Sequence, residues 1–172
     1  MKGDLHTLKK ACLYGSMVMA CGAMVIAAVI VVIVSLGIGS FVSETFADIL
    51  GSMIQLSLED DSATVVVAAY AEMLLIFLLA FVTVLTIYWM MSSIHEDHSP
   101  FSVDNTDRAM VLSRIYFMAA VVIAILELLG GRGFGSVLFM FFGCILIAVV
   151  LFMFSLIIRY GSVLQDESDR TL

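Results

Sequence analysis

Two carboxylates interrupt stretches of the chain that are otherwise strongly apolar. Glu72 is the one charged residue within residues 64–91, and Glu127 lies near the end of the apolar run at residues 109–129. Acids inside a membrane are costly and usually face a helix bundle or a water-filled cavity. Such groups can carry protons or bind a cationic ligand. Equally, one of them can pair with Arg132 or lie near the membrane surface, so the sequence leaves several uses open.

Other patterns that resemble chemical sites are weaker. His95 and His98 have i, i+3 spacing, which can direct two imidazoles at a metal ion, but no third ligand is evident. The glycine-rich residues 130–135 are not followed by the Gly-Lys-Ser/Thr of a phosphate-binding loop, so they indicate a tight turn. No nucleophile–base pair is visible. We therefore expect no metal site, no cofactor and no enzymatic activity.

The elements that must position these residues are four apolar runs. Of the 172 residues, 62% are apolar and 13% are charged, whereas a soluble domain has about 45–50% apolar and about 25% charged residues. The mean hydropathy is +1.13, and each run exceeds the roughly 20 residues that a spanning helix needs. We predict an all-α fold, an integral membrane four-helix bundle in a single domain. The expected spans are residues 11–39, 64–91, 109–129 and 136–158, with a cytoplasmic loop at 92–108 and a tail at 159–172.

The first connection, residues 41–63, contains five acids and no lysine or arginine. Its apolar residues recur at helical spacing, namely Val42, Phe46, Ile49, Leu50 and Met53. This pattern predicts a short amphipathic helix in the first extracytoplasmic loop, either on the membrane surface or capping the bundle.

The distribution of basic residues predicts the orientation. Seven of the eight lie on the side of the two termini and the central loop, and only Arg132 lies on the other side. The positive-inside rule then places both termini in the cytoplasm of a multi-pass plasma-membrane protein. The net charge of −7 gives no reason to expect direct nucleic-acid binding. Small residues four apart, such as Ala11 and Gly15, predict a packing face, used within the monomer or in a homo-oligomer.

Two cytoplasmic segments contain distinctive polar residues. Before the third span, Pro100, Phe101, Ser102, Asn105 and Arg108 form the pattern Pro-Phe-Ser-x-x-Asn-x-x-Arg. At the C-terminus, a second pattern comprises Tyr160, Gly161, Leu164, Gln165, Glu167, Asp169, Thr171 and Leu172. In these segments and in its four spans, the chain resembles the domain of unknown function 2975 family of small bacterial membrane proteins. Ala109 departs from the leucine that the family pattern has after the arginine.

The resemblance implies no assigned activity. Members of the family are often encoded beside a small helix-turn-helix regulator, which implies a regulatory role and a cytoplasmic partner of that kind. We therefore expect a regulatory or sensory module whose cytoplasmic face binds a soluble partner. The alternatives are a small transporter or channel that uses Glu72, and an immunity or envelope-protection protein.

Residue chemistry also predicts how the cytoplasmic segments are built. Ser102 is a candidate helix N-cap, and Phe101 before it is placed to fold back on the first turn. In an antiparallel bundle the tail and the central loop are neighbours. We therefore expect the tail to pack beside the central loop and Arg108 to pair with an acid of the tail, the candidates being Asp166, Glu167 and Asp169.

Overall fold

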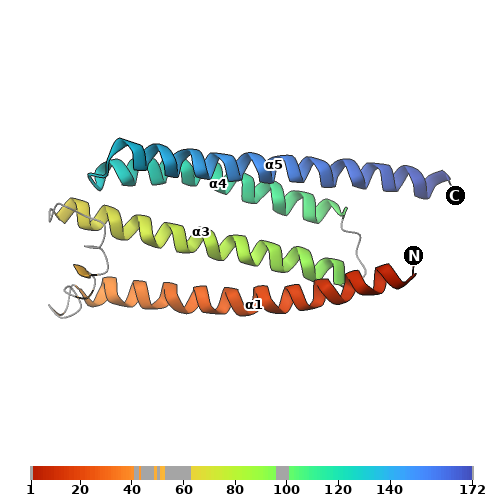
Figure 1. Cartoon of the computed structure of the whole chain (residues 1–172), viewed down its shortest axis with the longest axis horizontal. Coiled ribbons are helices and arrows are strands. Elements are labelled where there is room, and N and C mark those ends of the chain that lie inside the picture. Colours follow the sequence, from red (N-terminus) through yellow and green to blue (C-terminus); the bar gives the residue numbers. More distant parts are fainter. Residues whose placement is uncertain are drawn as a thin grey trace. The chain divides into compact units, whose positions relative to one another are not determined.

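A computed structural model describes residues 2–40, 43, 49, 51–52, 63–95 and 101–171, without the side chains of residues 2–8, 63, 169 and 171. The long helices within these residues are α1 (Lys2–Gly39), α3 (Ala63–His95), α4 (Val103–Leu129) and α5 (Phe134–Thr171) (Figure 1). Each of the four is long and apolar enough to cross a membrane. The prediction of an all-helical chain with four potential spans is confirmed.

The helices continue past the spans expected from hydropathy. α4 begins at Val103, inside the segment expected to be a loop, and α5 continues through the tail to Thr171. α1 and α5 each contain 38 residues, which at about 1.5 Å per residue gives a length of about 57 Å, well above the roughly 30 Å of hydrocarbon. The amphipathic helix predicted in the first loop lies outside the described residues, apart from Ser43, Ile49 and residues 51–52.

Contacts between residues divide the chain into two compact units, and every long helix contributes a section to each. Unit 1 comprises Met1–Met24, Val82–Tyr116 and Leu146–Leu172, and unit 2 comprises Val25–Phe81 and Phe117–Ile145. Unit 1 therefore holds both motif segments of the sequence, and unit 2 holds both acids of the apolar runs. The single domain expected from the sequence stays a prediction.

In unit 1, α1 and α3 pack in antiparallel order. A Cβ on Gly15 would lie 2.7 Å from the Met91 Sδ atom, and a Cβ on Gly22 would lie 3.8 Å from Val84 Cγ1. Gly22 follows Gly15 on α1, whereas its neighbour Val84 precedes Met91 on α3, so the two helices run in opposite directions. Small residues permit this approach of two helices. Gly15, part of the predicted packing face, is used within the chain.

Two further helix pairs of unit 1, α3 with α4 and α4 with α5, are joined by polar contacts. The Thr83 and Tyr116 hydroxyls lie 2.9 Å apart and join α3 to α4. The Ser113 hydroxyl of α4 donates to the Ala148 carbonyl oxygen of α5 at 2.8 Å. A buried hydroxyl needs such a partner, because an unsatisfied one costs about 1–3 kcal/mol. These bonds order the neighbours as α3, α4 and α5.

In unit 2, α1 and α3 meet around a tyrosine. The Tyr70 hydroxyl donates to the Ile33 carbonyl oxygen at 3.1 Å, and a Cβ on Gly37 would lie 3.0 Å from Tyr70 Cε2. Ala69 is buried beside Tyr70, with Leu36 packed against it. The absence of a side chain at Gly37 therefore makes room for the tyrosine ring.

Burial differs between the helices. α4 is the most buried of the four candidate spans, and α1 and α5 are the least buried. Large apolar side chains are widely exposed on α5, for example Phe139 at 79%. Apolar surface this extensive is rare on soluble monomers. It is the surface that a lipid bilayer would cover.

Candidate functional site

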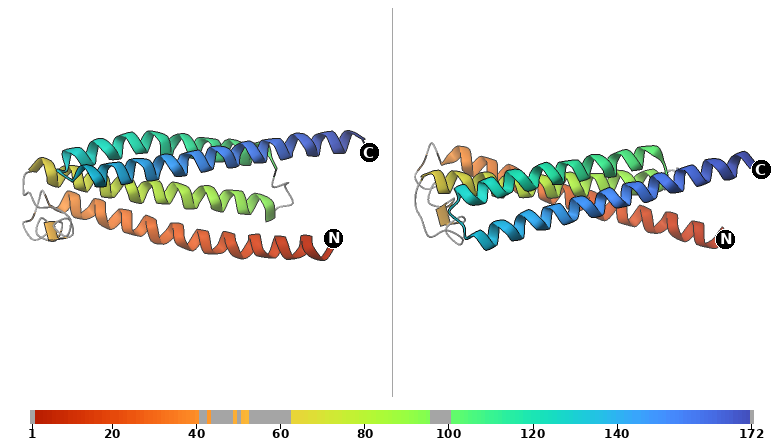
Figure 2. Two further views of the ribbon diagram at one scale, coloured as in Figure 1. Left: turned by 45° about the horizontal axis from the view of Figure 1, so that its top comes forward. Right: turned by 90° about the horizontal axis from the view of Figure 1, so that it is seen from above.

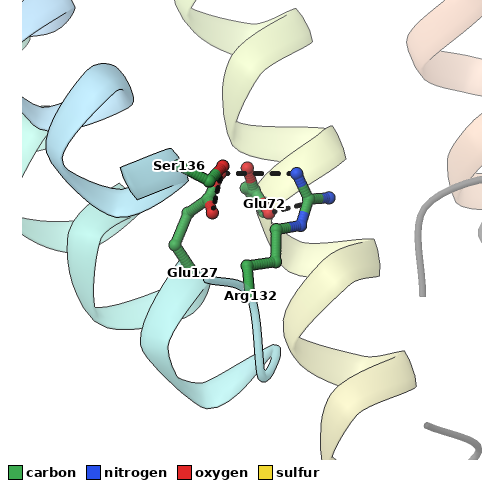
Figure 3. A network of polar contacts seen from close by, with 4 residues as sticks. All are labelled: Glu72, Glu127, Arg132 and Ser136. Atoms are coloured by element: carbon green, nitrogen blue, oxygen red, sulfur yellow. Dashed lines mark hydrogen bonds and ion pairs between the residues drawn. The ribbon is translucent and has the colours of Figure 1, made fainter. Parts of the chain in front are cut away.

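A charged cluster lies in unit 2, where α3, α4 and α5 each contribute a polar side chain (Figure 3). Arg132 Nη2 lies 3.4 Å from Glu72 Oε2, and Arg132 Nη1 lies 3.4 Å from Glu127 Oε1. The Ser136 hydroxyl donates to Glu127 Oε2 at 3.0 Å. One guanidinium thus spans two carboxyl groups from different helices. We call these four residues the Arg132 cluster.

The backbone at the end of α4 brings Arg132 to Glu127. The Gly131 N–H donates to the Leu128 carbonyl oxygen and the Arg132 N–H donates to the Glu127 carbonyl oxygen, while Gly131 has φ of 68°. This is the Schellman arrangement, in which the residue after a left-handed glycine faces the residue five positions earlier. That contact is often hydrophobic, whereas here it is an ion pair. Gly131 is suited to the position because it has no Cβ.

The connection from α4 to α5 is short, since α4 ends at Leu129 and α5 begins at Phe134 (Figure 2). Ser136 is therefore in the first turn of α5 and faces back toward Glu127. Sequence reasoning missed Ser136, because a serine near a helix start is common and has no distinctive spacing. The signal that was available is the short glycine-rich turn, which brings residues on either side of it together.

The acids of the cluster are buried, so their charges need partners. Glu127 is fully buried, Glu72 is 3% exposed and the Arg132 side chain is 26% exposed. A buried charge is tolerated only when it is paired and hydrogen-bonded. The sequence left open whether an acid pairs with Arg132, and the structure shows that both Glu72 and Glu127 do so.

The first motif segment leads into α4 in unit 1. Ser102 Oγ accepts the Asn105 backbone N–H at 3.2 Å, and the Ser102 carbonyl oxygen accepts the Thr106 N–H at 3.1 Å. These are the bonds of a helix N-cap, so that prediction for Ser102 is confirmed. The Asn105 side chain is fully buried. Pro100 lies outside the described residues.

The two motif segments meet in unit 1. A Cβ on Gly161 of α5 would lie 2.8 Å from Phe101 Cε1 and 2.9 Å from Phe101 Cγ, so the ring rests on the glycine backbone. The expected packing of the tail beside the central loop is confirmed at this contact. Other residues of the second motif are exposed, including Tyr160 at 68% and Leu164 at 48%. Gln165 and Glu167 are exposed as well, and the Asp169 side chain lies outside the described part.

Arg108 has a different partner from the one expected. Its Cζ lies 5.8 Å from the centroid of the Trp89 ring of α3, a distance typical of a cation–π contact. Asp166 instead pairs with Arg170 at 2.9 Å. Among the described residues Arg108 is not paired with Asp166 or Glu167, so these two of the three expected pairs are wrong. The third candidate, the Asp169 side chain, lies outside the described residues.

The next feature is the set of side chains that could ligate a metal ion. Within the described residues, no group of three or more His, Cys, Asp or Glu side chains is placed to hold a metal ion. His95 ends α3 in the described part, whereas His98 lies outside it.

Comparisons of this chain with protein-family models, with curated proteins and with solved structures find no match. The family resemblance of the two motif segments stays a prediction. Two features of the structure bear on function, the Phe101–Gly161 contact in unit 1 and the Arg132 cluster in unit 2.

Proposed function

We propose that the protein is a non-enzymatic regulatory membrane protein whose cytoplasmic face recruits a soluble protein partner. In this proposal the four helices cross the plasma membrane with both termini in the cytoplasm. The bias of basic residues to that side supports the orientation. The length and apolar surface of the helices support the insertion.

The observation that carries the proposal is the contact between Phe101 and Gly161. It joins the only two segments whose polar residues form distinctive patterns, although they lie far apart in the sequence. On the same two segments Phe101 is 43% exposed and Leu164 is 48% exposed, and both lie outside the apolar runs expected to span the membrane. Exposed aromatic and aliphatic side chains with a polar surround are typical of protein-binding surfaces.

Charge indicates the kind of partner. Asp104 and Asp107 are exposed near the start of α4, and Asp166 and Glu167 are exposed on α5. Of the arginines on α4 and α5, Arg108 lies on Trp89 and Arg170 is paired with Asp166, whereas Arg114 and Arg159 are exposed. The exposed acids would steer a basic partner toward them. A helix-turn-helix regulator has a basic DNA-binding surface and fits this requirement, so binding here would compete with binding to DNA.

The experiment is co-expression of the full-length chain with a helix-turn-helix regulator of the kind often encoded beside members of the family that the chain resembles. The membrane fraction should retain the regulator, and retention should fall as salt concentration rises. The double variant Asp104→Lys, Glu167→Lys should release the regulator, whereas Arg114→Gln on the same helix should not. A regulator that stays in the soluble fraction with the unaltered chain would contradict the proposal.

A further inference from the structure

The Arg132 cluster has more acids than bases. Within the described part of unit 2, the charged side chains are Glu72, Glu127 and Arg132. If all three are ionised, one negative charge remains without a counter-charge among groups that are nearly or fully buried. An uncompensated buried charge costs several kcal/mol. Binding one proton removes that charge.

The hydrogen bonds indicate which carboxyl holds the proton. Glu127 has both oxygens engaged as acceptors, Oε1 by Arg132 and Oε2 by Ser136. For Glu72 the contact with the guanidinium is that of Oε2, 3.4 Å from Arg132 Nη2. A proton on Glu127 would weaken two accepted contacts, whereas a proton on Glu72 would weaken one. The proton is therefore better accommodated on Glu72.

We propose that Glu72 and Glu127 form an intramembrane proton-binding site that holds one proton between them, with Arg132 as the fixed counter-charge. The proton resides on Glu72. When it leaves, both carboxyls are ionised and share one guanidinium. The site does not depend on the proposed cytoplasmic partner.

The described part of unit 2 contains no further charged side chain that would balance the charge differently. On α5 the neighbour is the neutral hydroxyl of Ser136. On α3 the nearby hydroxyl of Tyr70 donates to Ile33. Residues 25–39, the section of α1 in unit 2, include no charged residue. Arg132 is therefore the one cation in the described part of this unit.

The test is infrared spectroscopy of the full-length protein with carbon-13 glutamate, in an ester-free detergent at neutral pH. The other glutamates lie in polar segments, where an unperturbed carboxyl has a pKa of about 4.3 and is ionised at neutral pH. The unaltered protein should show the carbonyl band of one protonated glutamic acid, and the band should shift in deuterated water.

The variants should differ in the number of protonated glutamic acids, and so in the intensity of the carbonyl band. Glu72→Gln and Glu127→Gln should each abolish the band, because the remaining acid then forms a one-to-one pair with Arg132. Arg132→Gln should double it, because both acids are then neutral. Glu167→Gln, on the exposed part of α5, is the matched control and should leave it unchanged.

Two results would overturn the proposal. The first is an unaltered protein without the band at neutral pH. The second is a band that survives in either of the two glutamine variants, since the proton would then not depend on the pair. If Arg132→Gln does not fold, the two glutamine variants, which keep a balanced ion pair, still decide the question.

Discussion

The ring of Phe101 lies directly on the backbone of Gly161, so a residue just before α4 occupies the space that a side chain on α5 would take. Their contact explains why glycine is suited to this position of a long helix, where it otherwise costs about 0.5–1 kcal/mol relative to alanine.

Gly161→Ala should therefore destabilise the protein. The new Cβ would overlap the Phe101 ring, and overpacking of this kind costs about 1–3 kcal/mol. Gly143→Ala is the matched control on the same helix, because nothing lies within 4 Å of a Cβ there. Thermal unfolding in detergent should show a lower midpoint for Gly161→Ala and an unchanged or higher one for Gly143→Ala. In a Phe101→Ala background, the difference between the two should largely disappear.

Arg108→Ala should change the fluorescence of Trp89. The chain has a single tryptophan, so its emission reports on the guanidinium that lies 5.8 Å from the ring centroid. Arg114→Ala is the control, because Arg114 lies on the same helix and contacts Met110 instead. The loss of stability for Arg108→Ala should be small, about 0.5–1 kcal/mol. Identical emission spectra for both variants would show that Arg108 does not rest on the ring.

Two substitutions at Glu72 should show separately how the shape and the charge of this side chain affect stability. Glu72→Gln keeps the shape and leaves Glu127 paired with Arg132, so its effect on stability should be small. Glu72→Lys places a second cation beside Arg132 in a buried site, and disrupting a buried pair costs about 3–5 kcal/mol. Thermal unfolding in detergent should rank the lysine variant clearly below the glutamine variant. Equal midpoints would show that Glu72 is not buried against the cluster.

The orientation can be measured with cysteines in a background in which Cys12, Cys21 and Cys144 are replaced. An impermeant thiol reagent applied to intact cells should label Asp60→Cys and should not label Asp97→Cys. Lysed cells should show labelling of both, which controls for reactivity. Labelling of Asp97→Cys alone in intact cells would reverse the assigned orientation.

Hydropathy alone was sufficient to predict the four helices, because a run of apolar residues of that length has few other stable states. Local chemistry was sufficient for the ends of α4. Ser102 caps its first turn and the glycine-rich segment closes its last, and both depend on residues close in sequence. Helix length was underestimated at α5, because hydropathy marks where a helix is apolar and not where it ends.

The pairing of side chains between helices was decided only by the tertiary structure. Glu72, Glu127 and Arg132 were each conspicuous in the sequence, but it did not indicate that one guanidinium joins both acids. Likewise the contact of Arg108 with Trp89 was not foreseen and Ser136 was overlooked. Which side chains meet depends on the rotation and axial offset of one helix against the next, and both follow from packing along the whole contact.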